Sequence, residues 1–323
     1  MSNKFKNLYV LGDSLSDIGA FTGVLSNLSC ASGVKFDAPF YKNRSFSNGP
    51  VAVEYVAQYL NLKEFKPGWS YSFFNKEYEQ QGQNYAVSYA TAAKCSSFLY
   101  SYFFNKFCLA NQLDALIKHN SDIGEEDLVL ITIGGNDVML AYTCENNQTQ
   151  EAILNQATNE ICNVLKVLSQ HDVKHVVVTN APNIGLIPAF NKNKEASKLA
   201  MELTNSFNEK LANGLEKIKK DYPNLKVKQL DLYSKTNDLI DEYKNNGLNY
   251  QDACISDVAD GINGFTDIVS TLFDLIVKGK LESHYNPGCS KEVMENYFFF
   301  DFFHPTEEPH KQLGNDICEL IKV

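Results

Sequence analysis

The sequence lacks a run of apolar residues long enough to cross a membrane. Although 44% of its 323 residues are hydrophobic, no apolar stretch approaches the roughly 20 residues that a spanning helix needs. Met1 to Lys4 also lack the apolar stretch of a signal peptide, so we expect the chain to begin near a mature N-terminus. The chain also has fewer basic than acidic residues. Because 29 basic residues face 39 acidic ones, the net charge is −10, which disfavours general binding to nucleic acid or anionic membranes.

The eight cysteines lack the spacing of a metal site. None forms a C-x-x-C pair or stands near histidines spaced as ligands, so we expect no zinc. Their even count fits disulfides, and with them a secreted or periplasmic location. Buried free thiols, which pack as small hydrophobic groups, are the alternative. The cysteines are Cys30, Cys95, Cys108, Cys144, Cys162, Cys254, Cys289 and Cys318.

Short apolar runs alternate with helical patterns along the whole chain. The alternation predicts an α/β fold, with a parallel sheet covered on both faces, in a single domain over residues 1–323. The expected strands are residues 7–11, 84–87, 128–133, 175–179 and 225–230. The expected helices are residues 51–60, 151–168, 195–219 and about 309–321.

Two stretches interrupt this alternation and are expected to be insertions. The first, at about 95–108, is an aromatic run flanked by two cysteines, and the second, at 254–289, contains an amphipathic segment at 268–277. Insertions of this length are usually functional or disordered.

The first chemical signal is Ser14, which directly follows the first expected strand in the run Gly12-Asp13-Ser14-Leu15. A serine at the carboxyl end of a parallel strand, opening a helix, lies at the edge where such sheets bind ligands. Its own N–H, near a helix N-terminus, can donate to a developing oxyanion. A simple turn with an N-cap serine is the alternative. With Gly12 as its only glycine, the turn makes a poor phosphate cradle, which disfavours a nucleotide-binding protein.

The second signal follows the third expected strand, in Gly134-Gly135-Asn136-Asp137. The two glycines allow a sharp turn that leaves Asn136 at the same sheet edge as Ser14. A side-chain amide there can donate to an oxyanion, a contribution of roughly 3–4 kcal/mol in comparable sites. An ordinary Asn-Asp turn is the alternative.

The third signal, Asp301-Phe302-Phe303-His304-Pro305, lies just before the last expected helix. A carboxylate three residues before a histidine can reach its Nδ1 and leave Nε2 facing a serine as general base. A loop histidine beside a helix cap is the alternative. His310 has no matching acid, and we expect it on the surface of the helix. Together, the three signals predict hydrolysis by a triad of Ser14, Asp301 and His304.

At this point the chain resembles the GDSL (SGNH) hydrolase family. The resemblance is carried by residues 12–15, 134–137 and 301–305, and by residues 44–50, which are similar to the Arg-Phe-Ser-Asn-Gly-Pro segment of many longer members. It implies a flavodoxin-like three-layer α/β/α sandwich with a five-stranded parallel sheet. It also implies an oxyanion hole made by Ser14, Tyr89 and Asn136, with Gly12, Asp13 and Gly135 in support.

Within the family, the sequence is similar to secreted bacterial phospholipases A and glycerophospholipid:cholesterol acyltransferases. The shared features are the Ser-Asn-Gly-Pro segment, the long spacing from Ser14 to Asp301, and a cysteine pair around an insertion before the last motif. This resemblance implies a Cys254–Cys289 disulfide, and a loop between these cysteines that an activating protease can clip.

The second family motif departs from its usual form. The family has Asn-x-Ala-x-Gly-Gly-Ala, whereas this chain places Tyr89 at the second glycine. The oxyanion hole needs only the backbone N–H, which tyrosine retains. If the position requires a positive φ, however, tyrosine is strained there.

The resemblance implies an acyl-enzyme on Ser14, with water or a sterol taking the acyl group. It also implies that no metal or cofactor is needed. The aromatic runs 98–104 and 297–300 suggest an apolar wall for an acyl chain, although core packing would also explain them. (Lyso)phospholipids are therefore the expected substrates. A carbohydrate O-acetylesterase or arylesterase, and a lipid- or glycan-binding protein with little catalysis, are the alternatives.

Overall fold

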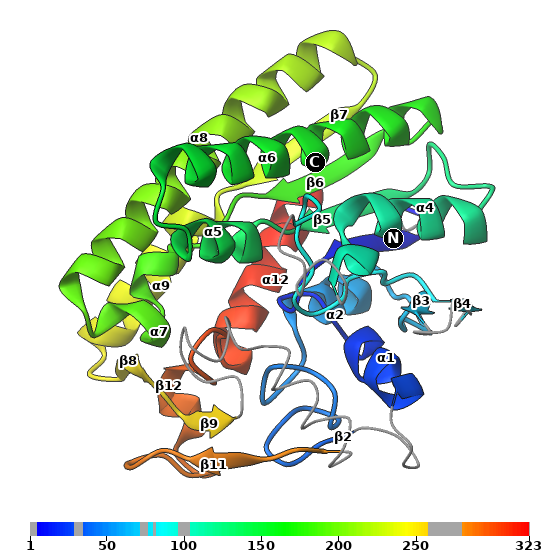
Figure 1. The fold of residues 1–323 in the computed structure, drawn as a ribbon. Coiled ribbons are helices and arrows are strands. Elements are labelled where there is room, and N and C mark those ends of the chain that lie inside the picture. The colour runs from blue at the N-terminus through cyan, green and yellow to red at the C-terminus, as the bar shows by residue number, and fades with distance from the viewer. Residues whose placement is uncertain are drawn as a thin grey trace.

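A parallel sheet of regular strands forms the centre of the protein. The computed structural model describes residues 5–28, 35–71, 77–79, 82–95, 104–257 and 280–322. The central strands lie in the order β1-β5-β6-β7, and all neighbours are parallel (Figure 1). Their bounds, close to those expected from the apolar runs, are β1 Leu8–Gly12, β5 Leu128–Thr132, β6 His175–Thr179 and β7 Lys226–Leu230.

The fifth expected strand, at residues 84–87, runs beside β1 without forming a regular strand. Tyr85 N–H donates to Val10 O and Val87 N–H to Gly12 O, at 2.7 and 3.1 Å. Asn84, however, uses its side chain to accept from Ala86 N–H, and such local bonds compete with a ladder. The five expected strands are thus present as four regular strands and one irregular edge segment. With that segment outside β1, the order is that of the flavodoxin-like sheet.

Helices cover both faces of the sheet, as the alternation predicts. Along β1, Tyr9 and Leu11 enter one apolar core, and Leu8 and Val10 enter the other. In Figure 1 the long helices α6 and α8 lie together on one face, and α2 and α12 pack in the other core. The helix bounds are α1 Ala20–Leu28, α2 Ala52–Tyr59, α4 Leu109–His119, α5 Gly135–Tyr142, α6 Asn147–Gln170, α7 Pro188–Asn191, α8 Lys194–Asp221, α9 Leu232–Asn245 and α12 Glu307–Ile321, with short 3-10 turns at Asn105–Phe107, Ile184–Leu186 and Met294–Asn296.

The short strands β2, β8, β9, β11 and β12 gather at one end of the molecule, below the sheet in Figure 1, whereas β3 and β4 lie at its side, next to α1 and α4. β8 pairs in parallel with β12, and β9 pairs antiparallel with β11. The backbone N–H groups of Cys254 and Ile255 donate to Phe299 O and Phe300 O, so this chain lies directly beside the residues that precede Asp301. The short strands are β2 Lys35–Phe36, β3 Trp69–Tyr71, β4 Glu77–Glu79, β8 Asn249–Ala253, β9 Ile255–Asp257, β10 Lys280–Leu281, β11 Ser283–Tyr285 and β12 Tyr297–Phe299.

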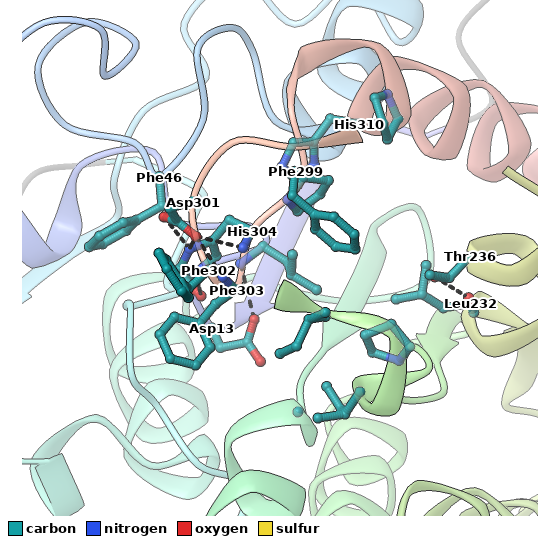
Figure 2. Close-up of a pocket in the computed structure, with 18 of the residues that line it drawn as sticks. Asp13, Phe46, Leu232, Thr236, Phe299, Asp301, Phe302, Phe303, His304 and His310 are labelled. Atoms are coloured by element: carbon teal, nitrogen blue, oxygen red, sulfur yellow. Dashed lines mark hydrogen bonds and ion pairs between the residues drawn. The ribbon is translucent and has the colours of Figure 1, made fainter. Parts of the chain in front are cut away.

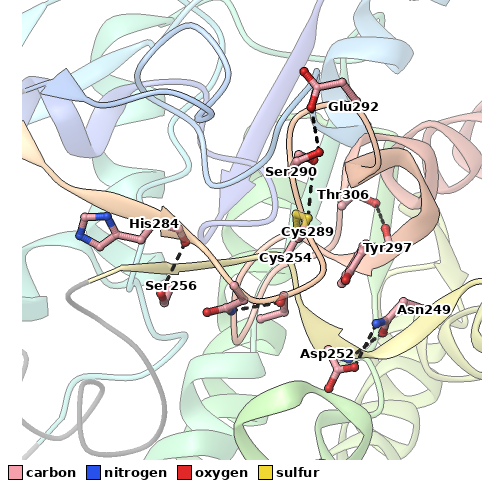
Figure 3. Close-up of a disulfide and its surroundings, with 12 residues drawn as sticks. Asn249, Asp252, Cys254, Ser256, His284, Cys289, Ser290, Glu292, Tyr297 and Thr306 are labelled. Atoms are coloured by element: carbon pink, nitrogen blue, oxygen red, sulfur yellow. Dashed lines mark hydrogen bonds between the residues drawn. A yellow bond between two sulfur atoms is a disulfide. The ribbon is translucent and has the colours of Figure 1, made fainter.

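A disulfide joins Cys254 to Cys289, the pairing that the resemblance implies (Figure 3). It closes the base of the expected insertion at 254–289. Residues 258–279, which contain the expected amphipathic segment and form part of the loop expected to be clipped, lie outside the described residues, as do residues 96–103 of the aromatic insertion. Three further cysteines are buried thiols, so the alternative of free thiols holds for Cys108, Cys162 and Cys318.

None of the helices within the described ranges combines the length and the apolar character of a membrane span. Likewise, nowhere in this part of the chain do three His, Cys, Asp or Glu side chains gather as a metal-binding group.

Replacing Gly314 with a larger residue tests how closely α12 packs on α2. A Cβ at this position would lie 2.8 Å from Ala52 O and from Tyr55 Cβ. Alanine normally stabilises a helix interior relative to glycine, but here we expect Gly314→Ala to lower the free energy of unfolding by about 1–3 kcal/mol through overpacking. Urea unfolding followed by circular dichroism measures this. Gly124→Ala, whose Cβ meets no atom closer than 3.8 Å, is the control, and a stabilising Gly314→Ala would contradict the close approach.

Candidate active site

The turn after β1 presents Ser14 at the carboxyl edge of the sheet. A side chain on Gly12 would place Cβ 2.5 Å from Thr132 O, so this close approach to β5 requires glycine. The fully buried amide of Gln112 clamps the same residue, accepting from Gly12 N–H and donating to Gly12 O at 2.8 Å each. Asp13 N–H donates to Thr132 O. The nucleophile candidate thus stands on a fixed turn, and Gln112, a polar residue within an amphipathic helix, is a contributor that sequence reasoning missed.

Ser14, His304 and Asp301 form a continuous hydrogen-bonded chain. His304 Nε2 lies 2.7 Å from Ser14 Oγ, across 290 residues of sequence. On the other side of the ring, His304 Nδ1 lies 2.8 Å from Asp301 Oδ2 (Figure 2). Because a carboxylate can only accept, Nδ1 carries the proton and Nε2 is free to accept from the serine hydroxyl. The structure therefore brings together the three residues predicted as a triad.

The Asp301 carboxylate is itself held in place by the backbone. It is buried and accepts the N–H groups of Phe303 and His304 at 2.8 and 2.7 Å. The imidazole of His304 stacks on Phe46, with ring centroids 4.8 Å apart. The carboxylate thus fixes one end of the imidazole, and the phenyl ring packs on one of its faces.

The segment at 44–50 supports the start of α12 as well as the imidazole. Asn48 Oδ1 accepts Glu307 N–H at 2.9 Å, in the first turn of the helix that follows His304. The Glu307 carboxylate in turn accepts from the Tyr55 hydroxyl on α2 at 2.8 Å. These contacts give a physical role to a segment that the sequence marked only by resemblance.

The three residues expected to form the oxyanion hole line the same pocket as the triad. Asn136 lies in the first turn of α5, is buried, and donates through Nδ2 to Ala90 O at 2.8 Å. This bond uses one of its two amide hydrogens, and the second is available for a ligand. Tyr89 has a φ of +66°, so its backbone adopts the left-handed conformation that the family motif supplies with glycine.

Two buried carboxylates hold the loop that carries Tyr89. Asp17 accepts both the N–H and the hydroxyl of Ser88 at 2.8 Å, and it also accepts the N–H groups that open α1. Asp137 accepts the N–H groups of Ala92 and Ala93 at 2.8 and 3.3 Å. The loop is therefore fixed on both sides of Tyr89. Sequence analysis assigned no role to either residue, although Asp137 stands in the second motif and Asp17 lies two residues after the first.

Burial changes the titration of the carboxyls next to the site. Desolvation raises the pKa of Asp13 to about 7, against hydrogen bonding from Leu15 N–H and the attraction of His304. It also raises the pKa of Asp137 to about 7, and the charge of Asp13 adds to this shift. Both groups therefore take up protons within the folded protein near neutral pH.

An apolar pocket runs from the triad along the edge of the sheet towards α9 and α12 (Figure 2). Phe298 and Phe299 line it, in agreement with the expected apolar wall, whereas Phe300 is fully buried against Phe40 and belongs to the core. The lining residues are Asp13, Ser14, Leu15, Phe46, Tyr89, Gly135, Asn136, Met139, Pro182, Ile184, Ile187, Leu232, Thr236, Leu239, Phe298, Phe299, Asp301, Phe302, Phe303, His304, Pro305, Pro309, His310 and Leu313.

The expectation that His310 lies on the surface is wrong. Its side chain is buried, with 1% of its area exposed, and it lines the pocket. The reason is helical geometry: His310, Leu313 and Ile317 are spaced by three and four residues and share the inward face of α12.

A carboxylate–imidazole–hydroxyl chain at the carboxyl edge of an α/β sheet is the arrangement found in serine hydrolases. Comparison with known sequences agrees, because the GDSL-like Lipase/Acylhydrolase family matches residues 8–317, and the chain belongs to this family. A GDSL esterase/lipase of Arabidopsis thaliana is 25% identical over 97% of this chain and 86% of its own length. Acetylajmalan esterase 2 of Rauvolfia serpentina is 25% identical over 57% of this chain and 55% of its own.

Solved structures with a similar course of the chain include a GDSL-like lipase from Parabacteroides merdae. It covers 97% of this chain and 94% of its own, with 10% identity and a TM-score of 0.46. An acetylxylan esterase from Geobacillus stearothermophilus covers 85% of this chain and 96% of its own, with 14% identity and a TM-score of 0.40. The narrower likeness to bacterial phospholipases A and acyltransferases stays a prediction.

Two substitutions at Tyr89 test its left-handed backbone. We expect Tyr89→Gly to be more stable than Tyr89→Ala by about 1 kcal/mol, because only the alanine carries a Cβ into the left-handed region. The two variants lose the same aromatic packing, so their difference isolates the backbone. Chemical unfolding of both proteins measures it. At the exposed helical position Gln156, the alanine variant should instead be more stable than the glycine variant. If alanine were also the more stable residue at position 89, that result would contradict the positive φ of Tyr89.

The raised pKa of Asp13 predicts a loss of stability with increasing pH. The folded pKa of about 7 lies above the usual value of 3.8, so between these values the folded protein holds a proton that the unfolded chain releases. The contribution of the Asp13 carboxyl to the free energy of unfolding is greatest below about pH 4. It declines as the pH rises towards 7, by up to about 1.4 kcal/mol per pH unit. We expect the uncharged Asp13→Asn variant to gain stability relative to the parent between pH 5 and pH 7 in urea unfolding. A constant difference across this range would contradict the buried protonated carboxyl.

Proposed function

We propose that this chain is a serine esterase that hydrolyses acyl esters through a covalent acyl-enzyme on Ser14. The observation that carries the proposal is the 2.7 Å contact between His304 Nε2 and Ser14 Oγ, with Asp301 on the other side of the ring. Membership of a family of esterases and acylhydrolases supports the same reaction class.

Each half of the proposed reaction uses the same three groups. His304 Nε2 takes the hydroxyl proton as Ser14 Oγ bonds to the ester carbon, and Asp301 stabilises the imidazolium that forms. The backbone N–H groups of Ser14 and Tyr89 and the Asn136 amide donate to the oxyanion. The leaving alcohol then takes the proton from His304. A water molecule, activated by the same imidazole, releases the acid and restores Ser14.

The apolar pocket favours lipid substrates, and we propose esters of (lyso)phospholipids with the acyl chain in the pocket. Apart from groups at the catalytic end, its wall is almost entirely aliphatic and aromatic, which suits a hydrocarbon chain. A charged head group would remain outside, because burying an unpaired charge is costly. A lipid alcohol such as a sterol that reached the acyl-enzyme in place of water would make the protein an acyltransferase.

A second candidate is hydrolysis of acetyl or aryl esters, including those of carbohydrates. The likeness to Acetylajmalan esterase 2 favours it, although the long apolar pocket is larger than an acetyl group needs.

The Cys254–Cys289 disulfide supports an oxidising, extracytoplasmic compartment as the working location of the enzyme.

Replacing the nucleophile gives the direct test of the proposed reaction. We expect Ser14→Ala to lower kcat for p-nitrophenyl esters by at least about 10⁴-fold, because no covalent intermediate can form. The folded state of the variant is checked by its urea unfolding curve, and Ser169→Ala on α6 serves as the matched serine control. Unchanged turnover in a folded Ser14→Ala protein would contradict the assignment.

The acyl pocket predicts a preference for longer chains. Across p-nitrophenyl esters from acetate to decanoate, we expect kcat/KM to rise with chain length, by up to about fourfold for each buried methylene. Release of fatty acid from lysophosphatidylcholine tests the lipid substrate itself, and a sterol added to the same assay tests acyl transfer. A maximum at acetate would favour the second candidate, and a folded protein without turnover would favour a binding protein.

A further inference from the structure

The pocket is polar at its catalytic end and contains two isolated polar side chains beyond it. Asp13, Ser14, Tyr89, Asn136, Asp301 and His304 belong to the catalytic end. The two others are Thr236 on α9 and His310 on α12, drawn in Figure 2 on the wall away from Asp301. Thr236 is already engaged, because its hydroxyl donates to Leu232 O at 2.7 Å.

His310, by contrast, has an unused polar atom. Its side chain is 1% exposed, and its Nδ1 has no hydrogen-bond partner among the residues that the structure describes. A buried polar atom without a partner destabilises the protein unless something else satisfies it. This imidazole lines the pocket, so a bound ligand can supply the missing partner once a turn of the ring about its Cβ–Cγ bond brings Nδ1 to the pocket surface.

The protonation state of the His310 imidazole indicates what kind of group this ligand presents to it. Burial lowers the pKa of His310 to about 3, and the neighbouring His304 adds to the shift. A neutral imidazole lacks the positive charge that would offset the cost of burying an anion, whereas it exchanges hydrogen bonds well with a hydroxyl, which can donate or accept. The group that pairs with His310 is therefore uncharged.

The position of the group on the substrate follows from the rest of the wall. Leu313, one turn further along α12, lines the pocket with His310, and beyond the catalytic end Thr236 is the other polar residue in the lining, so the portion of substrate beside His310 is otherwise hydrocarbon. In an acyl ester this is the acyl chain, because the alcohol of a phospholipid carries the charged head group.

We propose that His310 is a specificity residue that binds a hydroxyl on the acyl chain of the substrate. The enzyme then prefers esters of hydroxylated acyl chains over plain chains of equal length. This inference rests on the proposed esterase function and adds the substrate class to it. A plain chain still enters the pocket but leaves Nδ1 unpaired, so discrimination comes from a single hydrogen bond.

Matched ester pairs test this preference. Each pair contains a plain p-nitrophenyl ester and its analogue with one hydroxyl, moved carbon by carbon along a chain of fixed length. In the parent protein we expect one hydroxyl position to raise kcat/KM about tenfold over the plain ester, the effect of one net hydrogen bond. His310→Leu should reduce this ratio to about one. His310→Asn should retain part of this preference, because the asparagine amide nitrogen and oxygen are bonded to Cγ, as Nδ1 is in histidine.

The ratio of the two esters within one protein is the readout, so a general loss of activity in a variant does not mimic the result. A ratio near one at every position in the parent protein, or the same ratio in His310→Leu as in the parent, would overturn the inference and leave the esterase function intact. Absence of turnover of any ester by the folded parent protein would instead reject the proposed function, and the inference with it.

Discussion

The hydrogen bond between Ser14 Oγ and His304 Nε2 joins two segments that are 290 residues apart. It requires the turn after β1 and the loop before α12 to keep a fixed separation. Gln112 clamps the first of these, and Asn48 caps the helix that follows the second. The backbone bonds from residues 254 and 255 to the chain before Asp301 hold the loop from its other side. The sheet, the final helix and the segment closed by the disulfide thus all help to hold Ser14 Oγ and His304 Nε2 at hydrogen-bonding distance.

Buried carboxylates organise the other half of the site. An unpaired buried charge is costly, and each of these groups is satisfied by several backbone N–H donors. Asp17 and Asp137 hold the loop on either side of Tyr89, and Asp301 holds the imidazole. Their burial raises the pKa of Asp17 and Asp137. The donors expected to meet an oxyanion are therefore fixed before any substrate arrives, which is the condition for strong electrostatic stabilisation.

The sequence predicts those features that depend on local pattern. Apolar runs locate the regular strands, and motifs that directly follow strands locate Ser14 and Asn136, because parallel strands bring their carboxyl ends to one edge. Contacts made across the fold have no local signal. Gln112 is an unremarkable polar residue of a helix until its partner on β1 is known. His310 does have a local signal, because its spacing from Leu313 and Ile317 places it on the apolar face of the last helix. The absence of a nearby acid does not indicate that a histidine is exposed.

The central claim is that the Ser14 hydroxyl is activated by His304, and covalent labelling tests it most directly. The folded protein is treated with a fluorophosphonate and its adduct located by peptide mass spectrometry. Our account predicts one probe per chain, on the peptide containing Ser14. It also predicts almost no labelling of His304→Ala. An adduct on another residue, or equal labelling of both proteins, would contradict the account.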